Sequence, residues 1–346
     1  MKIAAVTCVK NEGPFILEWI AFNQIIGVTG FLFYSNDCDD GTDVMLDALA
    51  GHGIVTHLPN PARNGKYQME ALRDAGRQKI ITGADWIWNA DIDEFLNIHA
   101  GSGTIQDLIE ACGRPDLISV SHQNFANGGV GEYVDEPVIG QFFHSHNPDI
   151  WMDRLDIEVK TLMRGGLPVA RFGAHRPFLK DDLRKSRMPR WTDGSGRPVS
   201  RRFVLNLGEK RRLGFSARGA RQHATLNHYA LRSLDSYLVK SDRGDVNRAN
   251  RELTDTYWCE RNDGAFRDDT ITRYLKPLAA RIDQLKKLPG IADLHEAAVA
   301  AHRAKIAALR QRGDFAELRA RLAAAPTIPP AELAVIAALE NGLAPL

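Results

Sequence analysis

The first 120 residues alternate between short apolar runs and segments with helical spacing, which constrains the fold more than any other feature of the chain. Apolar runs rich in bulky residues are typical of buried strands, whereas apolar residues at helical spacing indicate helices. This alternation predicts a doubly wound, mostly parallel sheet with right-handed crossovers. Strands are predicted at 3–9, 30–35, 53–58, 85–90 and 116–121, and helices from Pro14 and at 44–49, 66–81 and 104–112.

Polar residues follow three of these strands at the point where each strand ends. The clusters are residues 10–12 (Lys-Asn-Glu), 36–42 (Asn-Asp-Cys-Asp-Asp-Gly-Thr) and 91–94 (Asp-Ile-Asp-Glu). In open α/β sheets, ligands bind just outside the carboxyl ends of the strands. We therefore expect the three clusters to converge on one ligand site.

The third cluster places two carboxylates, Asp91 and Asp93, directly after the bulky apolar run at 86–88. Carboxylates in this position hold a hard divalent cation that faces phosphate, or act as nucleophile or base. Both could bind one cation only if the chain turns there. A solvated turn is the plain alternative, but the position after a buried strand favours a metal site.

The second cluster has two readings. A strand-to-helix turn in which Asp40 caps the next helix explains most of its composition. Its place at a strand end also suits a contact with a nucleobase or ribose. Asp37 and Asp39 form a second Asp-x-Asp pair, so that motif alone is weak.

A later group begins with His228, which precedes a helix-like segment that ends near Lys240 and Arg243. Histidine on a cation, with lysine and arginine on phosphate oxygens, could complete a metal–diphosphate site. A lone histidine is more often a structural residue, so the spacing leaves both interpretations open.

Charge is segregated, because residues 171–221 contain 15 Lys/Arg and 4 Asp/Glu in a chain of net charge +1. Interspersed aromatic residues superficially suit single-stranded nucleic acid. No recognised nucleic-acid module accompanies them, so we expect no nucleic-acid partner. A solvated loop, or a peripheral contact with an anionic membrane that carries a lipid-linked acceptor, are the alternatives.

Cysteine usage and hydropathy predict a cytoplasmic protein. The four cysteines form no Cys-x-x-Cys pair, which argues against a zinc knuckle or a disulfide framework and fits a reducing compartment. No apolar stretch reaches the roughly 20 residues of a membrane span, and the first residues do not resemble a signal peptide. Residues 270–346 are rich in Ala, Leu and Arg at helical spacing and predict a helical extension.

Four blocks, in their order and spacing, resemble the family-2-type glycosyltransferases, and especially a bacterial branch related to family 92 whose strand ends in Asp-[Leu/Ile]-Asp-Glu-Phe. The blocks are residues 9–20, 27–42, 86–96 and 228–244. The resemblance implies a GT-A fold, with a nucleotide-sugar-binding half at 1–120 and an acceptor-binding half at 121–250. It also implies transfer from a nucleotide sugar, commonly a UDP-sugar, to a hydroxyl of a saccharide or lipid-linked acceptor. Inversion and cell-surface polysaccharide synthesis are the expectations.

The same resemblance implies roles for individual residues. A Mn²⁺ or Mg²⁺ ion on the diphosphate would be held by Asp91, Asp93 and His228. The nucleotide sugar would be lined by Thr7, Asn11, Glu12, Asp37, Asp91 and Lys240.

The base that takes the acceptor proton is not assigned by the sequence. Glu94 ranks low as a base, because its neighbours would make it a structural brace. The candidates are Asp153, Asp156, Glu158 and His175.

Two other classes compete with a glycosyltransferase. A phosphotransferase of the haloacid-dehalogenase type also has Asp-x-Asp after a strand, but usually the first strand, and here Phe95 occupies a position that is normally Thr or Val. A non-catalytic nucleotide- or polysaccharide-binding protein could keep the fold without the chemistry. The intact carboxylates and the intact His–Lys block favour the enzyme.

Overall fold

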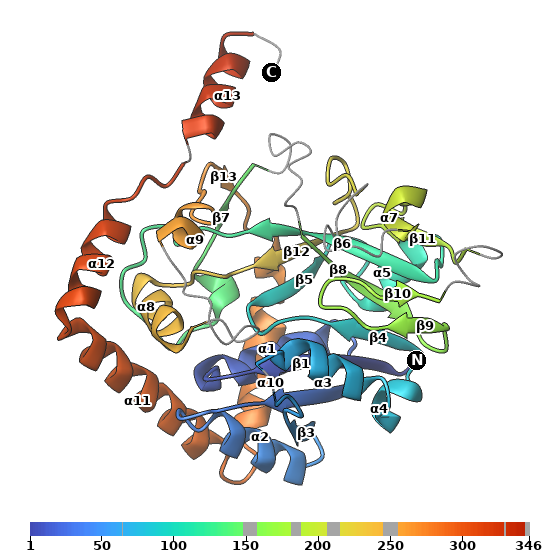
Figure 1. Cartoon of the computed structure of the whole chain (residues 1–346), viewed down its shortest axis with the longest axis horizontal. Helices are drawn as coiled ribbons and strands as arrows, with labels where there is room; N and C mark the ends of the chain where they lie inside the picture. The colour runs from blue at the N-terminus through green and yellow to red at the C-terminus, as the bar shows by residue number, and fades with distance from the viewer. Residues whose placement is uncertain are drawn as a thin grey trace.

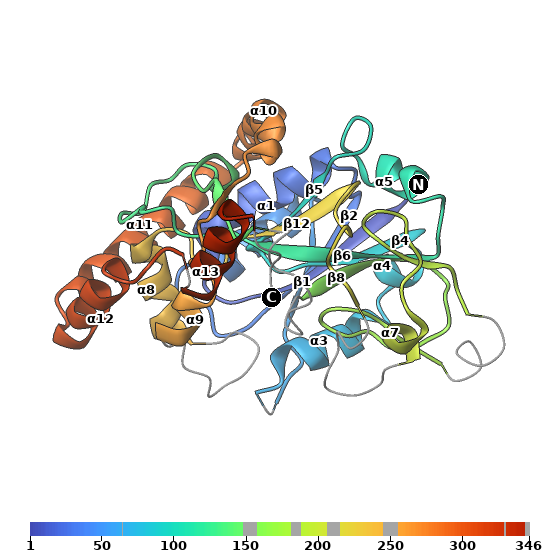
Figure 2. The same ribbon diagram turned by 90° about the horizontal axis from the view of Figure 1, so that it is seen from above.

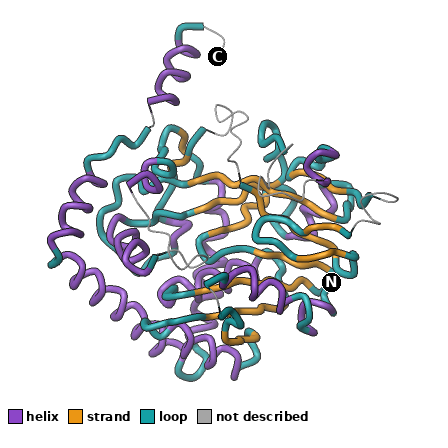
Figure 3. The backbone as a smooth tube through the Cα atoms, in the orientation of Figure 1, coloured by secondary structure: helices purple, strands orange, loops and turns teal. Residues whose placement is uncertain are grey.

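A mixed β-sheet forms the centre of the protein, with helices packed around it and a helical arm towards the C-terminus (Figures 1 and 3). The structure is a computed structural model that describes residues 1–63, 65–147, 158–180, 188–205, 215–244, 255–328 and 330–342. The strand order is β3 (Thr56–Pro59), β2 (Gly30–Ser35), β1 (Ile3–Val9), β4 (Trp86–Asn89), β8 (Val159–Arg164), β6 (Leu117–Asn124), β12 (Ala224–His228) and β5 (Glu94–Ile98), and β11 (Trp191–Asp193) pairs with β6.

The sequence-predicted alternation is confirmed in the first half of the sheet, where β1 pairs in parallel with β2 and β4, and β2 with β3. The helix predicted at 66–81 is in fact two helices separated at Gly76, and the third strand begins at Thr56 instead of residue 53. The helices of this half are α1 (Gly13–Ile25), α2 (Thr42–Gly51), α3 (Tyr67–Ala75), α4 (Lys79–Thr82) and α5 (Ile105–Ala111).

The second half of the sheet adds antiparallel neighbours. Strand β8 pairs antiparallel with β4 and β6, and β12 pairs antiparallel with β5 but parallel with β6. The sequence analysis missed β5, which follows the Asp-x-Asp turn at once. Shorter elements surround these strands: β7 (His144–Ser145) with β13 (Phe266–Arg267), β9 (Val169–Arg171) with β10 (Phe178–Leu179), α7 (Arg201–Leu205), η1 (Val138–Gly140) and η2 (Thr270–Tyr274).

The core lies on both faces of the sheet. Alternate residues of β1 enter two different hydrophobic clusters: Ile3 and Ala5 face one, and Ala4 and Val6 face the other. Figure 2 shows α1 and α10 (Leu275–Lys286) on the first face, and α3 and α7 on the second. Burial on both faces explains why the strands read as nearly continuous apolar runs.

The C-terminal part is helical, as predicted. Helix α11 (Ile291–Arg310) lies against α1, α2 and α8 (Leu234–Arg243), and α12 (Gly313–Ala323) packs on α8 and α9 (Asp255–Cys259). A methyl group at Gly13 would lie 2.7 Å from Cβ of Ala298, so this close crossing of α1 and α11 favours glycine. Helix α13 (Pro330–Glu340) extends beyond the body (Figure 1). Among the described helices, none has both the length and the apolar character to cross a bilayer.

A buried carboxyl in α1 predicts a pH-dependent stability. Glu18 accepts hydrogen bonds from the backbone N–H groups of Val138 (2.9 Å) and Ile139 (3.2 Å). Burial raises its pKa from 4.5 to about 7, against the effect of these hydrogen bonds. As pH rises, Glu18 loses its proton in the unfolded chain before it does so in the folded protein. The free energy of unfolding should therefore fall by about 3 kcal/mol between these two pH values. In urea unfolding at about pH 5 and about pH 8, Glu18→Gln should show a smaller pH difference than the wild type; equal differences would contradict this assignment.

Candidate functional site

The structure brings together the three polar clusters that follow β1, β2 and β4. Asn11 and Asp39 exchange hydrogen bonds, from Asn11 Nδ2 to Asp39 Oδ1 (2.5 Å) and from the Asp39 backbone N–H to Asn11 Oδ1 (2.9 Å). The backbone N–H of Glu12 donates to Thr42 Oγ1 (2.9 Å), and that of Gly13 to Asp40 (3.0 Å). The first two clusters therefore form one interlocked surface, as the strand ends predicted.

The Asp-x-Asp motif lies in a turn between β4 and β5. The backbone N–H of Glu94 donates to the Asp91 carbonyl (3.0 Å), and the backbone N–H of Asp91 donates to the Glu94 carboxylate (2.9 Å). The turn that a shared ligand would require is therefore present. Glu94 is only 2% exposed and braces this turn, which is the structural role expected for it.

The two aspartates have different surroundings. Asp91 Oδ2 lies 3.0 Å from Lys160 Nζ, and its Oδ1 accepts from Gln68 Nε2 (3.2 Å). Lys160 also lies 3.3 Å from Glu94 and is 1% exposed. Burial raises the pKa of Asp91 and of Glu94, and Lys160 opposes that rise. Burial would lower the pKa of Lys160, but the two carboxylates more than offset it, so the lysine stays charged.

Asp93 is held by residues that come later in the chain. Lys240 Nζ donates to Asp93 Oδ2 (2.8 Å) and to the Ala230 carbonyl (2.8 Å), while His228 Nε2 lies 3.6 Å from Asp93 Oδ1. Burial would raise the pKa of Asp93, but Lys240 and His228 outweigh it and hold the pKa well below its usual value. Asp93 is therefore a carboxylate at neutral pH.

The tautomer of His228 bears on what could lie between it and Asp93. Its Nδ1 lies 2.9 Å from Asn124 Oδ1, an acceptor, so Nδ1 carries the proton when the ring is neutral. Burial lowers the pKa of His228, although Asp93 opposes this, and so favours that neutral ring. The Nε2 lone pair then faces a carboxylate oxygen across 3.6 Å. Two such acceptors fit a divalent cation, with Asn124 fixing the ring as metal-bound histidines usually require.

The structure offers a cation fewer protein ligands than the three predicted from the sequence. Among the described residues, no group of three or more His, Cys, Asp or Glu side chains is arranged as a complete metal site. Asp91 is engaged by Lys160 and Gln68. Asp93 binds Lys240 through Oδ2, so its Oδ1 and His228 Nε2 are the two candidate protein ligands. Mg²⁺ is commonly held by few protein groups together with substrate phosphate oxygens.

Glu12, predicted to line the nucleotide, is held between two arginines. Arg232 Nη1 lies 2.8 Å from Glu12 Oε2, and Arg243 Nη2 lies 2.7 Å from Glu12 Oε1. Burial would raise the pKa of Glu12, but the two guanidinium groups lower it overall. Arg243 also donates to the carbonyls of Lys10 and Asn11. Glu12 thus fastens the later helical segment to the end of β1, and its contact with a nucleotide stays a prediction.

The other predicted nucleotide contacts lie on the same side of the sheet. Thr7 is buried in β1, and its Oγ1 has no hydrogen-bond partner among the described residues. Asn11 and Asp37 both have positive φ angles (51° and 47°), and Asp37 accepts from Tyr67 Oη (3.2 Å). Backbone strain of this kind often accompanies functional loops.

The base candidates divide between described and undescribed residues. Asp153 and Asp156 lie outside the residues that the structure describes. Glu158 lies 3.6 Å from Nε2 of His175, whose ring is 6.4 Å from that of His122. His122 in turn is 4.9 Å from the ring of His228. This row of imidazoles connects the two described candidates to the surroundings of Asp93.

Sequence reasoning missed Lys160, Arg232 and His122. Lys160 is the one charged residue within the apolar run Val159–Met163, a signal that could have pointed to a buried partner. His122 follows the predicted strand at 116–121 and lies within β6, and burial lowers its pKa to about 4. Arg232 gave no pattern that separates it from other arginines.

Part of the chain is similar to a known family. Residues 4–161 match the model of glycosyltransferase family 92. The match covers Asp91, Asp93 and Lys160, and it confirms the resemblance drawn from the sequence. Residues that approach this segment from the later chain, among them His228 and Lys240, lie outside the match.

Curated relatives carry the same family name. A glycosyltransferase family 92 protein of Oryza sativa subsp. japonica is 31% identical over 109 residues, which is 30% of this chain and 17% of the relative. One of Ricinus communis is 28% identical over 108 residues, 30% of this chain and 18% of the relative. The aligned part thus spans less than a fifth of each relative.

The similarity to solved structures is low. S. aureus TarS 1–349 in complex with UDP-GlcNAc has a TM-score of 0.36 and 9% identity, covering 99% of this chain and 93% of that one. HddC from Yersinia pseudotuberculosis has a TM-score of 0.27 and 11% identity, covering 47% and 69%.

Proposed function

We propose that this protein is a metal-dependent glycosyltransferase that moves a sugar from a nucleotide sugar to a hydroxyl of a saccharide or lipid-linked acceptor. The proposed donor is a UDP-sugar, which family-2-type enzymes commonly use. Inversion, cell-surface polysaccharide synthesis and a cytoplasmic location belong to the same proposal. One observation carries it: Asp93 and His228 face each other across 3.6 Å beside Lys240, at the strand ends of a segment that matches family 92.

The proposed chemistry assigns each charged group a task. A divalent cation at Asp93 and His228 would stabilise the negative charge that develops on the departing nucleoside diphosphate. Lys240, whose pKa is raised by Asp93 despite the effect of burial, stays protonated and is placed to contact a phosphate oxygen. Asp91, neutralised by Lys160, suits a hydrogen-bond acceptor for the nucleotide better than a metal ligand.

Glu158 and His175 are the proposed site of proton removal from the acceptor. Glu158 is the more exposed of the two side chains, at 38% against 14%, so we assign it the acceptor hydroxyl and give His175 an orienting part. Direct attack by that hydroxyl on the face of the sugar opposite the diphosphate would invert the anomeric centre. The division into a nucleotide half (1–120) and an acceptor half (121–250) is part of this proposal.

Calorimetric titration of UDP tests the function. UDP should bind in the presence of Mn²⁺, and addition of EDTA should weaken the binding strongly. The reason is that the proposed cation links the diphosphate to Asp93 and His228, and EDTA removes that cation. Binding that ignores EDTA would argue for recognition without a cation. If UDP does not bind, titration of GDP and dTDP decides between another donor and a protein that retains the fold without this chemistry.

Lys240→Ala should weaken the binding of UDP much more than that of uridine. The ammonium group lies beside the proposed diphosphate position, and a charge-assisted contact contributes about 1.5–3 kcal/mol, which corresponds to about tenfold or more in affinity. Paired titrations of UDP and uridine measure the difference, with Lys276→Ala, an exposed lysine of α10, as the control. Equal losses for both ligands would place Lys240 away from the diphosphate.

A further inference from the structure

Helix α8 presents two cations to the site from its inner side. Lys240 binds Asp93, and Arg243 binds Glu12 and the carbonyls at the end of β1. Both residues lie in the last turns of a single helix of ten residues. The position of that helix therefore sets the position of both cations.

The outer side of α8 is covered by the C-terminal helices. Leu238 and Val239 pack with Ile306, Leu309 and Phe315 in one small hydrophobic cluster. The start of α8 enters a second cluster, whose buried members are Leu231, Leu234, Tyr237, Trp258 and Leu322. Helices α11 and α12 thus contact α8 along its length.

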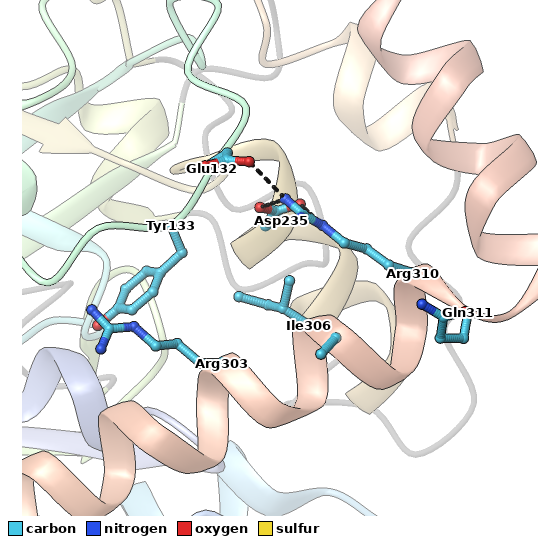
Figure 4. Close-up of a pocket in the computed structure, with 8 residues that line it drawn as sticks. Glu132, Tyr133, Asp235, Arg303, Ile306, Arg310 and Gln311 are labelled. Atoms are coloured by element: carbon cyan, nitrogen blue, oxygen red, sulfur yellow. Dashed lines mark hydrogen bonds and ion pairs between the residues drawn. The ribbon is translucent and has the colours of Figure 1, made fainter.

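Two acidic residues of α8 bind basic residues of α11 and α12. Asp235, which is 1% exposed, lies 2.6 Å from Arg310 Nη2 and 3.4 Å from Arg319 Nε. Asp242 lies 2.6 Å from Lys305 and 2.9 Å from Arg312. Figure 4 shows Arg310 reaching from α11 to Asp235 and to Glu132, at the edge of the pocket between α11 and the segment that carries Tyr133.

The burial of Asp235 distinguishes this pairing from an ordinary surface ion pair. An exposed pair contributes little, but a buried carboxylate that loses its partner must find another one or move towards water. Backbone hydrogen bonds from Leu234 and Asp235 to Val130 and Gly131 tie the same turn to the neighbouring segment. Loss of Arg310 leaves Asp235 with only the longer contact to Arg319, so α8 should shift from its position.

We infer that α11 and α12 act as a brace that holds α8 in register, and that Asp235 and Arg310 are positioning residues for Lys240. They touch neither the proposed diphosphate position nor Asp93 and act only through the placement of α8. The inference rests on the proposed function, because it gives Lys240 the diphosphate as its ligand.

The test compares three variants by titration of UDP and of uridine in the presence of Mn²⁺, using the whole chain. Arg310→Ala should lower the affinity for UDP roughly fivefold and leave the affinity for uridine within about twofold, in the range of mutations that couple distant sites. Arg310→Lys should recover part of the loss. Arg321→Ala is the matched control: it removes an arginine of α12 that binds Asp255 of α9, and it should leave both affinities unchanged.

The outcomes separate the brace from the nucleotide site. The brace would be overturned if Lys240→Ala removed the preference for UDP over uridine and Arg310→Ala retained it. The proposed function would then stay in place. Equal losses of UDP and uridine affinity in Arg310→Ala, with a lowered Tm, would show a merely structural pair. If the wild type bound UDP no more tightly than uridine, both the proposed function and the brace would be overturned.

Discussion

Asp93→Asn should lower turnover by about 10²- to 10³-fold, or about 3–4 kcal/mol of transition-state stabilisation. Asparagine keeps the shape of the side chain but removes the negative charge that binds both Lys240 and the proposed cation. The readout is the rate of UDP release from a UDP-sugar that the wild type uses, together with Mn²⁺-dependent UDP binding.

Asp116→Asn provides the matched control for this variant. Asp116 binds Arg164 at the start of β6, away from the strand ends that carry the site, so turnover should be unchanged. A Tm measurement separates lost chemistry from lost structure, since Asp93 also neutralises the buried Lys240. Turnover of Asp93→Asn within threefold of wild type would remove the central assignment of this site.

Lys160→Met should destabilise the fold by about 3–5 kcal/mol, because it leaves the buried carboxylate of Glu94 and the partly buried carboxylate of Asp91 without their shared cation. Methionine approximates the length of the lysine stem, so the loss reports charge more than volume. Urea unfolding at neutral pH measures it. The loss should shrink as pH falls, because burial has already raised the pKa of both carboxylates and protonation relieves their repulsion.

A second substitution distinguishes pairing from packing at Lys160. In Lys160→Met combined with Glu94→Gln, one of the two unpaired charges is gone, so the double variant should be more stable than Lys160→Met alone. If the two losses simply added, Lys160 and Glu94 would be independent and the pairing would contribute little. His122 Nε2, 3.0 Å from Glu94, is a neighbour whose protonation could respond to either change.

The ligands predicted for the proposed metal site differ from those that the structure brings together. The resemblance implied three protein ligands, and the structure places two of them, Asp93 and His228, opposite each other. Asp91, which carries the motif's first carboxylate, faces Lys160 on a neighbouring strand. Asp91 pairs with Lys160, whereas Asp93 pairs with Lys240 and faces His228, so the two carboxylates of one motif have different partners.

Local sequence patterns were sufficient to predict several elements of the fold. Apolar runs and helical spacing located β1, α1 and β2 to within a residue or two, because burial on both faces and amphipathicity leave direct traces in the order of residues. The strand-end rule then selected Asp93 and the cluster around Asn11 as one surface. The break at Gly76 and the strand after the Asp-x-Asp turn escaped this reasoning, since short segments carry too few residues to show a period.

The pairing of buried charges, in contrast, depends on how distant segments pack together. Lys160 reaches Asp91 across 69 residues, Arg232 reaches Glu12 across 220, and Arg310 reaches Asp235 across 75. No local pattern encodes which residue is the partner, although a charge within an apolar run, as at Lys160, indicates that a partner is needed. Burial makes the difference: once the sheet and helices pack, a charge removed from water must be matched by whichever opposite charge the fold brings beside it.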